Sequence, residues 1–287
     1  MKHVHNLLIL AAVLLSAACA KSGEPDGVAP VTVRVSGIAV SQRDFTKADP
    51  VEEFDSVTAL TIAFFKSDGS LYLKQTQLLA DTSTYEYFGE LSVPLPHGRY
   101  TLVVLGYNST SELSLTSPTQ AAFITDQVRE TFAYSTSVNI SNTDDLMLIP
   151  VLQRVVSRLE IVSKDKLPER VASVKVTFAD GSKRFNPSTG LALDNDGAIT
   201  IEAPSSAVGA VNTTLAYIFL STDEQTMNVT ITTLDASNNE IYSKTVSNVP
   251  FKRNRITTLT GRIFTGDADV TVMMTDDWLD SAPAINF

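Results

Sequence analysis

The sequence predicts an all-β protein built of two tandem β-sandwich domains with few short helices. Three observations support this fold class. Apolar and polar residues alternate in many segments, as in 31–35 (Val-Thr-Val-Arg-Val), which is typical of strands with one buried face. Turn signals such as Asp68-Gly69 separate the apolar runs at short intervals. The chain of 287 residues is long enough for roughly two domains of ordinary size.

The first half of the chain contains a series of predicted strands. The sequence patterns indicate strands over 31–40, 57–65, 71–73, 90–95 and 100–107. Asp68-Gly69 predicts a hairpin between the second and third of these strands, because glycine tolerates the positive φ of a tight turn. Pro94 restricts its strand to a sheet edge or a bulge, since proline cannot donate to a ladder.

The second half repeats this organisation. Further strands are predicted over 155–163, 171–178, 198–202, 215–220, 227–234 and 241–246. A helix is expected over 117–130. We place the boundary near Pro150–Val156, which gives domains at 31–153 and 154–287, and we assign both sandwiches to the transthyretin-like, Greek-key type. The second domain would end in an extended C-terminal strand at 266–287.

The N-terminus has the pattern of a secretory signal peptide. A basic start and the apolar run from Leu7 to Leu15 precede small residues and Cys19. The segment resembles a bacterial lipobox, although Ser16 stands where leucine is usual. We therefore expect a signal peptide at 1–18, an acylated Cys19 and a lipid-anchored linker at 19–30. Plain secretion is the alternative interpretation.

Composition excludes several classes of function. The net charge of −10 disfavours nucleic acid as a partner. One cysteine and three histidines offer little for a zinc site or a nucleophile–base pair, and we interpret His97 as an exposed turn residue. We interpret Asp144/Asp145 and Asp276/Asp277 as solvated loop charges, and 194–197 does not match a calcium loop. We expect no enzyme activity, no catalytic residues, no metal and no cofactor.

Several segments carry a family resemblance, namely the lipobox and 45–48, 55–69, 95–102, 155–161 and 249–261. Together they resemble the fimbrillin-type lipoprotein pilins of type V pili in Bacteroides- and Porphyromonas-type bacteria. The resemblance implies a subunit of a cell-surface fimbrium that supports cell adhesion. In that family the precursor is lipidated, carried to the outer membrane and cut after a basic residue. The cut removes the first strand, and an extended segment of the next subunit fills the groove.

This resemblance assigns roles to particular parts of the chain. The removable strand would be 31–40, with Arg43 and Lys47 as the candidate processing sites. The tail offers four donor-strand candidates, Val270, Val272, Met274 and Trp278. A tail that instead folds back into its own sandwich remains an equal alternative.

The expected partners are other pilin subunits, in a homo- or hetero-polymer, the outer membrane through the lipid on Cys19, and host or bacterial surface ligands. The expected location is the outer membrane, lipid-anchored and surface-exposed, and the fimbrium after processing. Two other functions remain open: a non-polymerising anchor or tip subunit, and a surface glycan-binding lipoprotein. The latter would need Trp278 exposed in a cleft.

Overall fold

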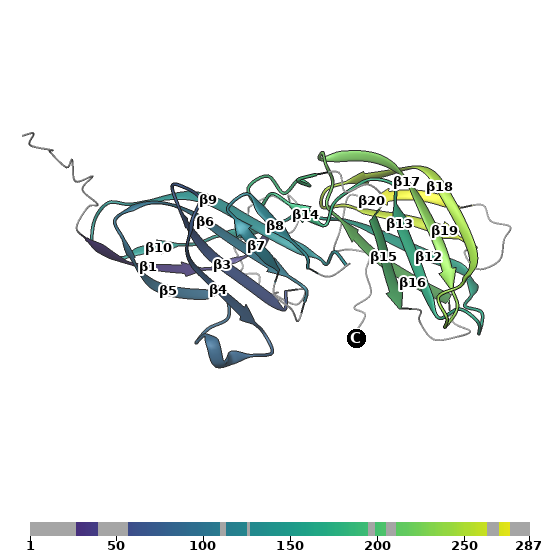
Figure 1. Cartoon of the computed structure of the whole chain (residues 1–287), viewed down its shortest axis with the longest axis horizontal. Helices are drawn as coiled ribbons and strands as arrows, with labels where there is room; N and C mark the ends of the chain where they lie inside the picture. The colour runs from purple at the N-terminus through teal and green to yellow at the C-terminus, as the bar shows by residue number, and fades with distance from the viewer. Residues whose placement is uncertain are drawn as a thin grey trace, which may run out of the picture.

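The computed structural model describes residues 27–39, 57–109, 113–124, 127–194, 199–204, 211–262 and 270–275. Within these residues the elements are strands, apart from the short 3₁₀ helix η1 (Thr82–Thr84). The predicted all-β sandwich fold is therefore confirmed. Figure 1 shows an elongated molecule, with the purple-to-teal half of the chain on one side and the green-to-yellow half on the other.

The first group of strands forms two sheets. One has the order β2-β11-β9-β6-β3-β4, and the other has the order β10-β1-β5. Their bounds are β1 (Val28–Arg34), β2 (Gly37–Ala39), β3 (Ala59–Lys66), β4 (Leu71–Leu78), β5 (Glu90–Pro96), β6 (Gly98–Tyr107), β9 (Thr131–Ile140), β10 (Leu146–Leu148) and β11 (Val151–Arg154). A hydrophobic cluster with members from both sheets, including Val33, Phe64 and Leu102, forms the first core.

The second group forms two four-stranded sheets, β16-β12-β19-β20 and β15-β13-β17-β18. Their bounds are β12 (Ser157–Lys166), β13 (Ser173–Phe178), β15 (Ile199–Pro204), β16 (Val211–Ile218), β17 (Glu224–Leu234), β18 (Glu240–Lys252), β19 (Ile256–Gly261) and β20 (Thr271–Thr275). A second core, which includes Leu159, Phe178 and Ile231, joins these sheets. The chain passes from the first group to the second at Val155 and Val156.

A fifth sheet, built of short strands, joins the two groups. It has the order β14-β8-β7, with bounds β7 (Ser114–Ser117), β8 (Gln120–Ala122) and β14 (Arg184–Phe185). Figure 1 shows it between the two sandwiches. A third hydrophobic cluster contains residues from both halves, for example Leu105 and Val156 together with Phe185 and Phe219. We call this cluster and the sheet β14-β8-β7 the joint. The rings of Phe185 and Phe219 stack with centroids 4.2 Å apart.

The predicted helix over 117–130 is wrong. The described residues of this segment contain the hairpin turn between β7 and β8, then β8 itself, and extended or irregular chain before β9. The hairpin is stabilised by a partner that is distant in sequence, because Phe185 of β14 pairs with Ala121 of β8. A helix prediction uses only local residues, so it cannot take this long-range pairing into account.

Two other sequence interpretations change. The linker was expected to reach residue 30, but β1 already begins at Val28 and Ala29 is buried. The strand expected over 31–40 is divided: β1 ends at Arg34, and β2 starts at Gly37 in the opposite sheet. Apolar residues alternate throughout β1 and β2. The sequence pattern therefore does not indicate that the chain leaves one sheet after Arg34 and enters the other at Gly37.

Candidate functional site: the first strand and the C-terminal edge strand

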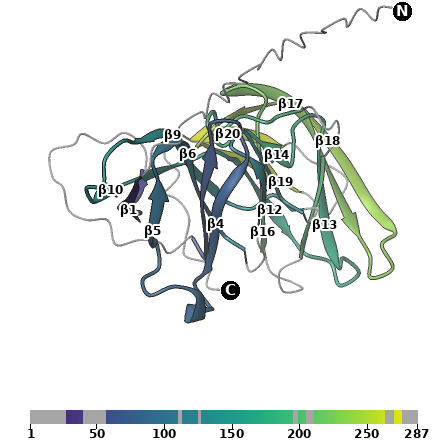
Figure 2. The ribbon, with the colours of Figure 1, turned by 60° about the vertical axis from the view of Figure 1, so that its left-hand side comes forward.

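The first described strand occupies the middle of a sheet. β1 lies between β10, to which it is parallel, and β5, to which it is antiparallel. Figure 2 shows the three strands side by side. Among the described residues of this sheet, β1 therefore joins two strands that are not paired with each other.

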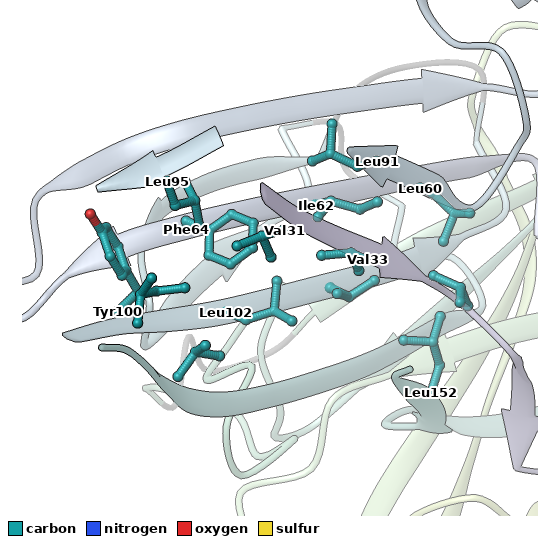
Figure 3. Packing of buried hydrophobic residues seen from close by; sticks show 14 of the residues in the cluster. Val31, Val33, Leu60, Ile62, Phe64, Leu91, Leu95, Tyr100, Leu102 and Leu152 are labelled. Carbon is teal, nitrogen blue, oxygen red and sulfur yellow. The ribbon is translucent and has the colours of Figure 1, made fainter. Parts of the chain in front are cut away.

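The inner face of β1 is deeply buried. Val31 and Val33 are 1% and 0% exposed, and Ala29 and Val35 are buried as well. Figure 3 shows Val31 and Val33 pointing from β1 into a layer that includes Phe64 and Leu95. Each fully buried valine stabilises the fold by about 1.5–3 kcal/mol. Removal of β1 would therefore expose an apolar surface that another strand could cover.

The hydrogen-bond register explains the prolines of this sheet. His97 N donates to Gly27 O (2.9 Å) and Val35 N donates to Gly89 O (2.9 Å), which extends the β1–β5 ladder at both ends. Odd-numbered residues of β1 therefore make the hydrogen-bonded pairs with β5. Pro30 faces Pro94 at the alternate type of pair, so neither proline removes a donor from this ladder. The prediction that Pro94 restricts its strand to an edge or a bulge is confirmed, because β5 is an edge strand of the sheet β10-β1-β5 among the described residues.

The outer face of β1 is polar and makes lighter contacts. Thr32 Oγ1 lies 2.9 Å from Ser92 Oγ, and Arg34 Nε donates to Glu90 Oε2 at 2.9 Å. The Arg34 side chain is largely exposed, and exposed ion pairs typically contribute less than about 1 kcal/mol. The burial of the inner face therefore dominates the attachment of β1.

His97 is not the exposed turn residue that the sequence suggested. It connects β5 to β6 and is half-buried, and its Nε2 is buried with no hydrogen-bond partner among the described residues. Its imidazole lies against Gly27, where an added Cβ would come within 2.2 Å of the ring. This half-buried imidazole packs on the residue that precedes β1, and among the described residues it belongs to no group of three or more potential metal-ligating side chains.

The chain leaves β1 by crossing to the other sheet. Ser36 N donates to Pro150 O (3.2 Å), and β2 then pairs parallel with β11, with Gly37 opposite Val151. The next described residue after Ala39 is Val57, which precedes β3. The processing candidates Arg43 and Lys47 belong to the intervening segment and lie outside the described residues.

The C-terminal strand has a different environment. β20 pairs antiparallel with β19 at the edge of its sheet, with Met273 opposite Thr258. Val272, Met273 and Met274 are 36%, 56% and 41% exposed. Consecutive side chains of a strand point to opposite faces, so both faces of β20 are open to solvent. Main-chain pairing with β19 therefore contributes most of the attachment of β20, although Val270, just before it, packs against the second core.

A buried charged cluster lies at the joint between the halves. Arg154 of β11 bonds Glu130 with Nη2 2.8 Å from Oε1, and its Nη1 donates to Asn254 Oδ1 (3.0 Å), between β18 and β19. Its guanidinium also lies over the ring of Phe132, 4.7 Å from the centroid. Burial lowers the pKa of Arg154 to about 10, against the opposing attraction of Glu130. Burial likewise raises the pKa of Tyr217 to about 12.

Some of the remaining predicted site residues are described by the structure, and others lie outside the described ranges. Among the donor-strand candidates, Val270 immediately precedes β20, and Val272 and Met274 are in it; Cys19 and Trp278 lie outside the described residues. Asp144 and Asp145 are exposed, as expected for loop charges. The described residues contain no group of three or more potential metal-ligating side chains. No helix among them is long and apolar enough to cross a membrane.

The sequence analysis did not identify the residues that pack around β1, which together form the site that β1 occupies (the β1 site). Leu91 and Leu95 of β5, and Leu148 of β10, pack in the same core as β1. The alternation of Leu91, Val93 and Leu95 was a usable signal for an inward face. Nothing in the local pattern identifies β10 as a neighbour, because it follows β1 by more than a hundred residues.

Comparisons with solved structures find similar proteins, and the first two below, with TM-scores of at least 0.50, show the same fold. A Bacteroides ovatus protein described as a "putative adhesin" matches with 14% identity and a TM-score of 0.51, covering 77% of this chain and 83% of that one. A second such protein from Bacteroides ovatus matches with 11% identity and a TM-score of 0.50, covering 90% and 97%. The fimbrial anchor protein Mfa2 from Porphyromonas gingivalis matches with 14% identity and a TM-score of 0.49, covering 88% and 98%.

At these identities the structural likeness shows the fold alone. No curated protein matches the chain in sequence. A sequence family described as "Family of unknown function (DUF6562)" matches residues 60–283, which is well over half of the chain. The protein therefore belongs to the DUF6562 family.

Proposed function

We propose that the protein is a structural subunit of a cell-surface fimbrium that supports cell adhesion and assembles by proteolysis-triggered strand exchange. The observation that carries the proposal is the position of β1: it is the first described strand, yet it lies in the middle of a sheet with Val31 and Val33 fully buried. A protein that loses this strand acquires an unpaired, apolar strand-shaped site, which is suited to β-augmentation by another chain.

Three further features support this function. The polar segment after β2 contains Arg43 and Lys47, where cleavage would separate β1 from the rest of the chain. The fold is shared with the two Bacteroides ovatus proteins described above. The fimbrillin-type resemblance adds acylation of Cys19, attachment to the outer membrane and surface exposure. The partners are then other pilin subunits and ligands on host or bacterial surfaces, and the protein has no enzymatic role.

The chain from residue 20 onward, which lacks the signal peptide and Cys19, provides the test. We expect the intact chain to be monomeric in size-exclusion chromatography with light scattering. After limited trypsin cleavage within 43–47 and prolonged incubation, we expect a ladder of oligomers. The matched control replaces both sites (Arg43→Gln with Lys47→Gln) and should stay monomeric under the same treatment. A cleaved chain that has lost β1 and remains monomeric at high concentration would overturn the proposal.

An anchor or tip subunit is the second candidate function. The pairing of β20 with β19 within one chain favours it, because a subunit that keeps its tail accepts a strand without donating one. Deletion of 266–287 separates the two functions. A polymerising subunit loses assembly and keeps its thermal unfolding transition, whereas an anchor keeps its ability to bind a partner subunit. Global unfolding of the truncated chain would instead assign the tail to the ordinary core.

A further inference from the structure

A segment that overlaps β20 repeats part of the sequence of β1. Residues 29–35 read Ala-Pro-Val-Thr-Val-Arg-Val, and residues 268–274 read Ala-Asp-Val-Thr-Val-Met-Met. The alanine, both valines and the threonine occupy the same positions in the two segments. The match aligns Val270 with Val31 and Val272 with Val33.

The structure gives each matched position a role in the β1 site. Val31 and Val33 point into the first core and are fully buried. Thr32, between them, faces outward with its Oγ1 2.9 Å from Ser92 Oγ. A segment with Val-Thr-Val in this register would place two β-branched side chains in the core, and its hydroxyl group would meet Ser92. Met274 would take the place of the buried Val35, where an unbranched side chain can adapt to the available space.

We propose that the segment around β20 of one copy occupies the β1 site of a second copy in this register and direction. The inserted strand runs parallel to β10 and antiparallel to β5, as β1 does, and Thr271 lies opposite Ser92. This inference rests on the strand exchange proposed above and adds the direction and the register of the inserted strand.

Alternative registers fit the site less well. A slip by one residue turns Thr271 and Met273 inward and the two valines outward, which buries a hydroxyl group in an apolar core. A slip by two residues keeps the alternation and is the serious competitor. It moves every Cα by roughly 6.6 Å along the strand, so Thr271 would no longer face Ser92.

Disulfide trapping distinguishes these registers. Thr32 and Ser92 form a directly opposed pair of the type with close Cα atoms, which suits a cross-strand disulfide. A synthetic peptide of residues 266–276 with Thr271→Cys is incubated with the trypsin-cleaved chain from residue 20 onward, which has no cysteine of its own. The chain carries Ser92→Cys or, as position controls two residues away on β5, Glu90→Cys or Pro94→Cys.

We expect Ser92→Cys to trap the peptide about tenfold or more over either control, because a two-residue offset exceeds the reach of a disulfide. Equal trapping at the three positions, or a maximum at Glu90→Cys or Pro94→Cys, overturns the proposed register. Oligomerisation without trapping at Ser92→Cys refutes the register and leaves the strand-exchange function standing. Trapping at Ser92→Cys without oligomerisation has the opposite meaning: the site accepts this segment, but the chain does not polymerise.

A pair of neighbouring tail substitutions gives an independent test. Val272→Asp places a charge at the position of the buried Val33, whereas Met273→Asp places it at the position of the largely exposed Arg34. Both side chains are exposed in β20, so neither change should unfold the donor. The Val272→Asp peptide should lose binding, and the Met273→Asp peptide should bind like the original sequence. A reversed order of these effects would place the opposite face of the segment in the core.

Discussion

Val33 and Val28 belong to the same strand but differ completely in environment: Val33 is 0% exposed and Val28 is 52% exposed. Val33→Ala should lower the free energy of unfolding by about 1–3 kcal/mol, through lost burial and a residual cavity. Val28→Ala should change it by less than about 0.5 kcal/mol. Urea unfolding of both variants measures the difference. Equal effects would show that β1 is held by its main chain and not by its inner face.

Tyr217 makes stability depend on pH in a defined direction. Burial raises its pKa in the folded protein from 10.0 to about 12, so an unfolded chain loses this proton first as the pH increases. The stabilisation is complete below pH 10 and is lost as the pH rises through the raised value. Arg154, whose pKa falls from 12.5 to about 10, has the opposite effect over nearly the same range.

Tyr217→Phe isolates the tyrosine from these opposing groups. As the pH rises above 10, the original protein should lose the stabilisation from Tyr217, and the variant has none to lose. The unfolding free energy of the variant minus that of the original protein should therefore increase, as measured by urea unfolding at a series of pH values. A difference between the two proteins that stays constant with pH would contradict the assigned environment of Tyr217. Absorbance titration provides a second readout, because the original protein should show a late-ionising phenol that the variant lacks.

At the level of elements, β1 and β20 represent two opposite ways of holding a strand. β1 is paired on both sides and buried on one face, whereas β20 is paired on one side and exposed on both faces. Amides in β1 should therefore exchange with deuterium far more slowly than those in β20, since opening of β20 disrupts little buried surface. Peptide-resolved mass spectrometry over 28–34 and 271–275 makes the comparison. Faster exchange in β1 than in β20 would contradict this account.

Sequence patterns predicted elements best where their cause is local. The β3–β4 hairpin follows from Asp68-Gly69, and Gly69 adopts a φ of +82° as such a turn requires. The helix prediction over 117–130 failed because the β7–β8 hairpin depends on β14, which lies far away in the chain. The division of the strand over 31–40 had the same origin, since Ser36 bonds to Pro150 at the crossing.

The candidate site was predictable only in part for the same reason. The alternation of Val31, Val33 and Val35 indicated a buried face, but no pattern near β1 shows that β10 closes its other side. The repeat of Val-Thr-Val, at 31–33 in β1 and at 270–272 where β20 begins, is visible in the sequence. Its meaning, however, depends on knowing that Thr32 lies opposite Ser92 and that β20 is exposed.

At the level of the whole molecule, the joint should make the two sandwiches unfold together. The third hydrophobic cluster, the β14–β8 pairing and the Arg154–Glu130 pair all connect the halves or lie at their boundary. Differential scanning calorimetry should show one transition with equal calorimetric and van't Hoff enthalpies.

Phe185→Ala tests the coupling directly. The ring is fully buried, stacks on Phe219 and belongs to the cluster shared by both halves. Its removal should cost about 3–5 kcal/mol and separate the single transition into two, because the cavity forms at the joint. Phe251→Ala is the matched control, since Phe251 is equally buried but lies within the second core. Two transitions in the unchanged protein would show that the joint does not couple the halves.

The central position of β1 also has a kinetic consequence for any cut at Arg43 or Lys47. Hydrolysis of one peptide bond there leaves β1 in place, still paired with β5 and β10 and still anchored by its buried valines. The two fragments then behave as a tight noncovalent complex, whose lifetime is governed by the dissociation rate of the strand. The cut would therefore permit the exchange without setting its rate. The rate would depend on the dissociation of β1, which burial of Val31 and Val33 slows and which loss of a methyl group from either side chain would accelerate.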